Sequence, residues 1–173
     1  MNEEVKGAPR FCKMIDETIR NIGEYFSWLN TILVVVIILQ VVLRYVFGQG
    51  LVVLEELQWH LYGVGIMLGL SYCVVTDSHI RLDLLYDRFP QRGKQQVELY
   101  GHLFLLLPIV VVILLHGWPF LVESWRVGES SDSPIGICCR YVIKSFLLIG
   151  FGLLGVAALS KMMRSFAFLL KKD

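Results

Sequence analysis

Charged residues are missing from four long stretches of this 173-residue chain. The stretches run over 25–43, 57–76, 99–122 and 145–160, and every Asp, Glu, Lys and Arg lies outside them. One charge at the centre of a membrane-spanning helix costs about 2.5–3.5 kcal/mol on insertion scales. A bilayer core about 30 Å thick needs ~20 apolar residues, so the first three stretches are long enough to cross. Lys144 and Lys161 flank the shorter fourth stretch, and their long side chains can extend to place the ammonium groups in the polar interface of the membrane. The sequence therefore predicts an all-α integral membrane protein with four transmembrane helices.

The chain also lacks room for a soluble domain and lacks a surplus of positive charge. The longest segments between two stretches, 77–98 and 123–144, are too short to form their own hydrophobic core. The net charge is only +1, so no basic surface is large enough for nucleic acid to be a partner. We predict a single membrane domain over 1–173, with spans at about 25–46, 56–76, 97–122 and 142–162.

Cysteine is scarce, and its spacing does not match the common metal-binding patterns. The chain has four cysteines and no C-x-x-C motif. Cys73 lies in the second stretch, where a small packing residue is expected. Cys138 and Cys139 are adjacent, and adjacent cysteines rarely form an unstrained bridge. We therefore expect free thiols.

Ionisable groups that could move a solute are also missing from the four stretches. Transporters that act alone place such groups inside their spans, or break a helix near the membrane midplane. Here the polar residues within the stretches are mainly Asn30, Thr31, Gln40, Ser71 and histidines. We therefore expect neither an enzyme nor a channel or transporter that works unaided.

The histidines leave one alternative function open. His60 and His116 lie near the outer ends of the second and third predicted spans, at similar depth. Two facing histidines can hold a haem, so a haem- or quinone-binding subunit of an electron-transfer complex is the alternative. Because His79 lies in a loop, interfacial or packing roles are favoured for the histidines, and no cofactor is expected.

Lys and Arg are distributed unevenly between the two sides of the predicted membrane domain. Twelve of the 16 lie in the N-terminal segment, the connection 77–98 and the C-terminal tail, and four lie in the other connections. Positive charge accumulates on the cytoplasmic side of membrane proteins. Both termini are therefore predicted to be cytoplasmic, with 44–56 and 123–144 facing outwards.

Two amphipathic segments are predicted to lie as helices on the membrane surface. In about 10–22, one face carries apolar residues at helical spacing, namely Phe11, Ile15, Ile19 and Ile22. In about 79–89, one face carries apolar residues at the same helical spacing, namely Leu82, Leu85, Tyr86 and Phe89. Pro90 then ends the helix. For the second segment, a structured loop that touches the helix bundle is the alternative.

Small residues mark surfaces where helices can approach closely within a membrane. Gly65 and Gly69 lie in the second predicted span, and Gly152 and Gly155 lie in the fourth. These glycines could allow close packing between helices of this chain, and they could equally allow close packing against a larger membrane partner.

Two acidic residues, Glu55 and Glu56, begin the second span at its outer end. Carboxylates at a helix N-terminus are stabilised by about 0.3–1 kcal/mol, which accounts for the pair without a partner. The pair also suits a basic residue of another subunit. Both interpretations stay open on the sequence alone.

The order of these features resembles a known family. The Glu55-Glu56-Leu57 motif precedes the glycine-bearing span, HIRLDLL follows it at 79–85, and ESSDSP at 129–134 with RYVIK at 140–144 leads into the last span. Over about 23–160 the chain is similar to the DctQ-like small membrane subunit of tripartite ATP-independent periplasmic (TRAP) transporters. It departs from many relatives in having Cys138-Cys139 where they have a proline before the last span.

The resemblance implies a small, non-catalytic subunit of a bacterial inner membrane that binds a large membrane transport subunit and extends its scaffold in the lipid bilayer. It also implies sodium-driven uptake of organic anions, which a periplasmic solute-binding protein delivers. That protein would make transient contacts with the membrane subunits, and the outer segment 123–140 is the candidate contact surface for it. Ions and substrate would belong to the large subunit.

The candidate partner-contact residues are Glu55, Glu56, Gly65, Gly69, His79, Arg81, Asp83, Arg140, Lys144, Gly152 and Gly155. For His79, Arg81 and Asp83, a capped surface helix without a partner is the alternative.

Overall fold

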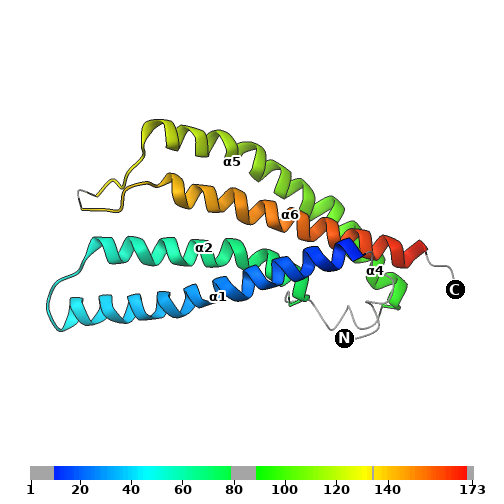
Figure 1. Cartoon of the computed structure of the whole chain (residues 1–173), viewed down its shortest axis with the longest axis horizontal. Helices are drawn as coiled ribbons and strands as arrows, with labels where there is room; N and C mark the ends of the chain where they lie inside the picture. The colour runs from blue at the N-terminus through cyan, green and yellow to red at the C-terminus, as the bar shows by residue number, and fades with distance from the viewer. Residues whose placement is uncertain (1–9, 79–88, 134, 171–173) are drawn as a thin grey trace.

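The protein is a bundle of long helices in a computed structural model that describes residues 10–78, 89–133 and 135–170 (Figure 1). In chain order these are α1 (Arg10–Tyr45), α2 (Val52–Thr76), α4 (Gln91–Gly101), the π-helical segment η2 (His102–Leu106), α5 (Leu107–Val127) and α6 (Tyr141–Leu170). Because α4, η2 and α5 run on as one, four helices are long and apolar enough to cross a membrane. The described residues form no strand. The predicted all-α class with four membrane-crossing helices is confirmed.

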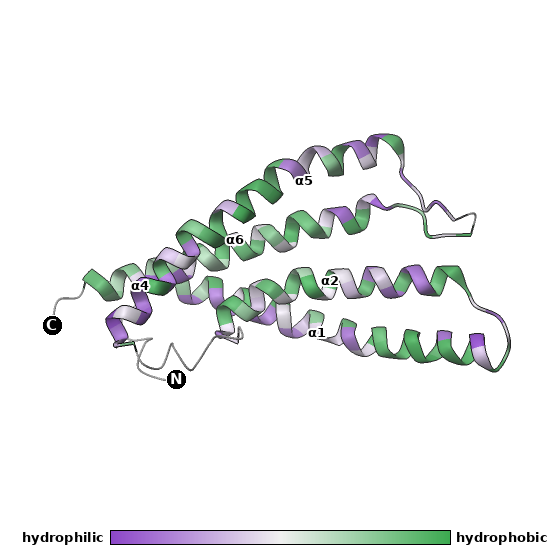
Figure 2. Cartoon of the chain, turned by 180° about the vertical axis from the view of Figure 1, so that it is seen from behind, coloured by the Kyte–Doolittle hydropathy of each residue, from purple (hydrophilic) through white to green (hydrophobic). Residues whose placement is uncertain are grey.

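The helices form two hairpins that lie side by side, α1 with α2 and α5 with α6 (Figure 1). The start of α1 and the end of α6 lie at one end of the bundle, and the α1–α2 and α5–α6 connections lie at the other. The central helix is α6, which packs against α1, α2, α4 and α5. Hydrophobic residues cover most of the length of the helices, and hydrophilic ones gather toward their ends (Figure 2).

The hydrophobic core lies toward the end of the bundle that carries the chain termini. Ile19, Val74, Val110, Leu154 and Ala157 form one buried cluster, with α1, α2, α5 and α6 each contributing. Burying each of the larger aliphatic side chains stabilises a fold by about 1.5–3 kcal/mol relative to exposure in water. In a membrane this gain largely disappears because lipid is equally apolar, so close packing must hold the helices together.

Glycine provides that close packing at three helix contacts. A Cβ on Gly150 of α6 would lie 2.8 Å from the backbone oxygen of Met67 in α2. A Cβ on Gly23 would overlap the ring of Tyr72, and one on Gly117 would lie 2.9 Å from Leu148. Side chains at Gly150 and Gly23 would push α2 away from α6 and α1 away from α2, whereas the end of the Leu148 side chain could yield to one at Gly117.

The segment 10–22 is not a separate helix on the membrane surface, because α1 continues without a break from Arg10 to Tyr45. Gly23, where a break could fall, is a contact point for α2 and remains helical. Of the face predicted to meet lipid, Ile19 is buried and Ile15 packs against the core, whereas Phe11 is exposed. The other predicted surface helix, 79–89, lies outside the described residues apart from its last position.

Helices α1 and α5 expose broad apolar surfaces along the bundle. Val35 and Ile38 of α1 are exposed, as are Val112 and Leu115 of α5. Such surfaces suit a hydrocarbon environment, which would solvate them without cost.

Candidate functional site

The carboxylate of Glu56, at the start of α2, holds the connection between α5 and α6. The hydroxyl of Ser131 donates to one carboxylate oxygen, and the backbone N–H of Ile137 donates to the other over 2.5 Å. Gly136 passes so close that a Cβ there would lie 2.8 Å from the Glu56 oxygen. Glu56 therefore joins the two hairpins at the end of the bundle away from the termini.

Glu129, at the beginning of the same connection, binds the two cations that the sequence marked as candidate contacts. Lys144 forms an ion pair with it, and Arg140 lies 3.8 Å from Glu129 and 3.5 Å from Asp132. The hydrogen bond from Lys144 is the main cause that lowers the pKa of the Glu129 carboxyl. The ammonium of Lys144 also lies 3.7 Å from the centre of the Phe120 ring. Both cations are thus occupied within the chain.

Glu55 points the other way, toward the turn between α1 and α2. The side-chain amide of Gln40 donates to Glu55 over 3.3 Å, and Arg44 lies 3.7 Å from the same carboxylate oxygen. Gln40 is itself buried and accepts a hydrogen bond from the N–H of Leu51, where α2 is about to begin. The acidic pair therefore fastens α2 to α1 on one side and to the α5–α6 connection on the other.

The four candidate glycines fall into two groups. A Cβ on Gly65 would meet Asn30 of α1 at 3.4 Å, and one on Gly155 would meet Val110 of α5 at 3.2 Å, so both serve contacts within the chain. A Cβ on Gly69 or Gly152 would meet nothing within 4 Å. Those two positions face open space. His79, Arg81 and Asp83 lie outside the described residues.

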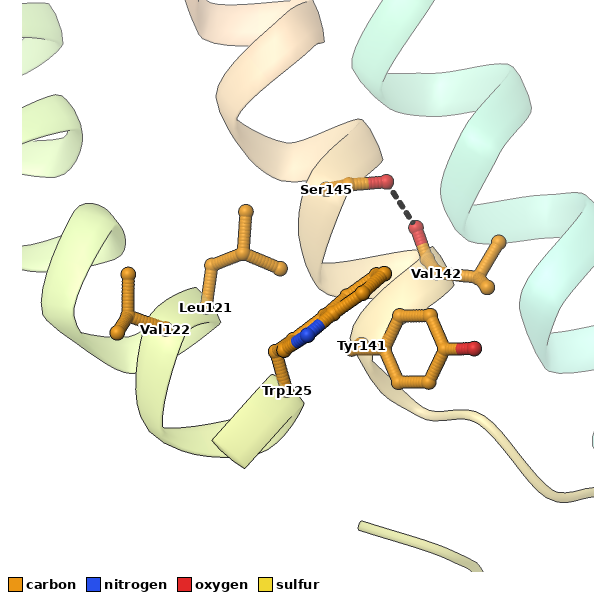
Figure 3. A pocket seen from close by; sticks show the side chains of 6 residues that line it. All are labelled: Leu121, Val122, Trp125, Tyr141, Val142 and Ser145. Carbon is orange, nitrogen blue, oxygen red and sulfur yellow. Dashed lines mark hydrogen bonds between the residues drawn. The ribbon is translucent and has the colours of Figure 1, made fainter. Parts of the chain in front are cut away.

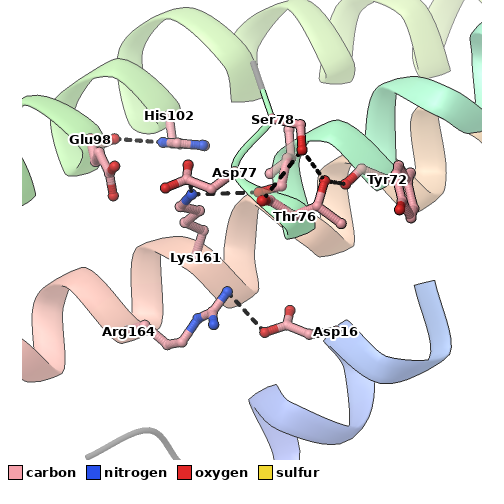
Figure 4. A network of polar contacts seen from close by, with 10 residues as sticks. Asp16, Tyr72, Thr76, Asp77, Ser78, Glu98, His102, Lys161 and Arg164 are labelled. Carbon is pink, nitrogen blue, oxygen red and sulfur yellow. Dashed lines mark hydrogen bonds and ion pairs between the residues drawn. The ribbon is translucent and has the colours of Figure 1, made fainter. Parts of the chain in front are cut away.

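A second polar cluster joins α1, α2 and α6 near the termini (Figure 4). Asp16 of α1, which is buried, forms an ion pair with Arg164 over 2.8 Å and accepts a hydrogen bond from Ser160 over 2.9 Å. Lys161 pairs with Asp77, whose left-handed backbone ends α2. Sequence reasoning missed this cluster. The available signal was Asp16, a carboxylate on the same helical face as Cys12 and Ile19.

An apolar hollow lies between α5 and α6 near the α5–α6 connection (Figure 3). It is lined by Leu121, Val122, Trp125, Tyr141, Val142 and Ser145. Trp125 and Tyr141 meet edge to face with ring centres 4.6 Å apart.

The histidines do not form the facing pair that the haem alternative requires. His60 on α2 and His116 on α5 each bond through Nδ1 to a carbonyl of their own helix, over 2.6 and 2.9 Å. Helix α6 lies between α2 and α5 (Figure 1). No cluster of three or more His, Cys, Asp or Glu suited to a metal ion occurs in the part of the chain that the structure describes.

The fold and its polar clusters define a multi-pass α-helical membrane protein whose charged side chains fasten its own helices together. Comparison with protein families identifies it further. The model of the DctQ component of tripartite ATP-independent periplasmic transporters matches residues 33–168. The chain belongs to this family and is a component of a TRAP transporter, as its motifs predicted. A search among curated proteins found no match.

Proposed function

We propose that the chain is the small, non-catalytic membrane subunit that binds the large transport subunit of its system and extends that subunit's scaffold. In this proposal the complex takes up organic anions with a sodium gradient, after a periplasmic solute-binding protein delivers them. The chain would lie in a bacterial inner membrane with both termini in the cytoplasm.

The family match over most of the chain is the observation that carries this proposal. The arrangement of charged residues is consistent with it, because Glu55, Glu56, Glu129 and Asp16 bind partners within the chain. A subunit that positions another protein needs such internal fastening, whereas a subunit that carries a solute needs groups left available along a path. Substrate and coupling ions would therefore belong to the large subunit.

The open glycines of α2 and α6 indicate where the large subunit would approach. Gly69 and Gly152 have no neighbour at the Cβ position, although glycine weakens a helix by about 1 kcal/mol relative to alanine. Small residues allow helices of two membrane proteins to pack closely. We therefore place candidate contacts with the large subunit at these two positions.

A leucine at Gly152 tests this placement without disturbing the chain's own packing. Gly152→Leu is expected to reduce the amount of large subunit that co-purifies from membranes, while the isolated variant still elutes as a single species. The control is Val112→Leu, at an exposed position of α5, because residues four apart on α6 would share the face of Gly152. This variant is expected to co-purify normally. Undiminished co-purification of Gly152→Leu and Gly69→Leu would remove both glycines from the interface.

A further inference from the structure

Two cysteine thiols lie in contact in the connection before α6. The sulfur atoms of Cys138 and Cys139 are 3.2 Å apart, and neither residue forms a disulfide. Cys138 is exposed and Cys139 is partly exposed. Both belong to the connection at the end of the bundle opposite the termini (Figure 1), so a small reagent can reach them from solution.

The backbone around this pair has an unusual conformation. Cys139 has φ of +68°, and Asp77 is the only other residue besides glycine with positive φ in the described part of the chain. Side chains disfavour this region, and such residues persist when their surroundings hold them there. Here the N–H of Arg140 donates to the carbonyl of Glu129, and the N–H of Val142 donates to the carbonyl of Cys139, both over 3.0 Å.

The two thiols differ in acidity because their neighbours differ. A hydrogen bond from Tyr141 is the main cause that lowers the pKa of the Cys139 thiol, since it stabilises the thiolate. The pKa of Cys138 is raised, chiefly by its hydrogen bond with Cys139. The thiolate is the nucleophile in disulfide exchange, so Cys139 is suited to attack first and Cys138 to attack second.

We propose that Cys138 and Cys139 form a redox-active dithiol that a low-molecular-weight disulfide oxidises to a disulfide between adjacent residues. The Cys139 thiolate attacks one sulfur of the oxidant, which forms a mixed disulfide and releases the first thiol. Cys138 then loses its proton and attacks the Cys139 sulfur, which releases the second thiol. Two electrons and two protons pass from the dithiol to the oxidant, and one sulfur–sulfur bond replaces another.

The location of the pair connects this chemistry to the outer surface of the protein. Closing the bond brings the sulfurs to about 2.05 Å and requires the backbone at Cys139 to move. Arg140 follows directly and pairs with Glu129 and Asp132. Oxidation would therefore rearrange the outer segment proposed to meet the solute-binding protein. This consequence rests on the proposed orientation, in which the segment faces an oxidising compartment, whereas the thiol chemistry does not.

Mass spectrometry of the chain in lipid nanodiscs tests the proposal. Cleavage after Arg126 and Arg140 releases residues 127–140, which contain this pair and no other cysteine. After incubation with oxidised glutathione, the peptide is expected to lose two hydrogens and both alkylation sites while the chain stays monomeric. Reduction should restore both sites. Two alkylated thiols after oxidation, or disulfide-linked dimers, would overturn the proposal.

Single substitutions test the order of attack. Cys138→Ser retains Cys139 and is expected to stop at a stable glutathione adduct. Cys139→Ser retains only the less acidic thiol and should form its adduct more slowly at neutral pH. Tyr141→Phe should slow the oxidation of the intact pair. Equal adduct rates in the two serine variants would overturn the assigned order. Since these readouts need no large subunit, they are independent of the proposed function.

Discussion

Glu56 begins a membrane-crossing helix, yet its carboxylate binds a segment some 75 residues further along the chain. Sequence reasoning identified the acidic pair and left open whether it capped its helix or met another subunit. The structure adds a third role, because Glu55 binds α1 while Glu56 binds the α5–α6 connection. Neither contact follows from local spacing, since both depend on how the hairpins are placed.

Removing the charge of Glu56 should loosen the α5–α6 connection. In Glu56→Gln the amide can still accept a hydrogen bond, but a hydrogen bond to a charged group, which is the stronger kind, is lost. We expect the amide of Ile137 to exchange its hydrogen faster than in the unchanged chain. Hydrogen exchange read by mass spectrometry over 129–140 measures this. The control is Glu55→Gln, which should leave that segment unchanged, and equal effects of both variants would contradict the assignment.

The ion pair of Glu129 should make the same connection sensitive to acid. Because Lys144 lowers the pKa of Glu129 below its ordinary 4.5, the pair contributes stability that is fully present above that value and is lost as the pH falls through the lowered pKa. Hydrogen exchange over 129–140, corrected for its intrinsic pH dependence, should stay constant from neutral pH to about 5 and then accelerate below about 4.5. Hydrogen bonds from Ser131 and Ile137 also lower the pKa of Glu56, which holds the same segment, so Glu129→Gln should reduce the step and leave a remainder that comes from Glu56. A step of full size in this variant would contradict the role of Glu129.

Helices α1 and α6 extend well beyond the thickness of a bilayer core. At 1.5 Å per residue, the 36 residues of α1 span about 54 Å and the 30 residues of α6 about 45 Å. The excess at the terminal end accommodates Asp16, Lys161 and Arg164, which could not lie in hydrocarbon without a large cost. The polar cluster thus forms where the helices leave the predicted charge-free stretches.

Breaking the buried ion pair between Asp16 and Arg164 should destabilise the contact of α1 with α6. Removing one partner of a buried pair costs about 3–5 kcal/mol, and the partial exposure of Arg164 reduces the expected loss to about 2 kcal/mol. We expect a clear fall in the melting temperature of Asp16→Asn in detergent. Arg20→Gln breaks an exposed pair with Glu24 and should cost less than about 1 kcal/mol. A similar loss in both variants would show that Asp16 does not act through Arg164.

Two neighbouring glycines of α6 should respond in opposite ways to alanine. Gly150→Ala places a methyl group against the backbone of Met67, and overpacking of this kind costs about 1–3 kcal/mol. Gly152→Ala meets open space and should be neutral or stabilising by up to about 1 kcal/mol, because alanine favours the helix. Thermal unfolding of both variants measures the difference. Equal stability would mean that α2 and α6 are not held at this distance.

The four membrane-crossing helices could be predicted because one charge in a span is so costly that its absence is informative. The unbroken course of α1 could not, since its charged amphipathic beginning and its apolar remainder were predicted as two segments, and the contact of Gly23 with Tyr72 of α2 is visible only in the fold. Likewise, the sequence cannot distinguish Gly150 from Gly152. Only the packing of α2 on α6 shows that Gly150 contacts α2 and Gly152 does not. The pairing of Asp16 with Arg164 joins residues from opposite ends of the chain, and no spacing rule connects them.

Across the whole molecule, the polar contacts described above lie at the two ends of the bundle, and apolar surface covers the sides. Polar clusters around Glu56 and Asp16 fasten the hairpins at opposite ends, and the glycine contacts hold them between. Such a body is suited to hold a fixed shape beside a larger membrane protein. This arrangement agrees with membership of the DctQ family and with the proposed scaffold role.

The central claim, that the chain works as the small subunit of a larger transporter, is tested most directly by purifying it from its native membranes in mild detergent. Mass spectrometry then identifies and counts what accompanies it. The proposed function predicts one large multi-pass membrane protein in stoichiometric amount, with large-subunit recovery reduced by Gly152→Leu. Purification of the chain alone as a stable homo-oligomer, or solute uptake by the chain alone in liposomes, would contradict the claim.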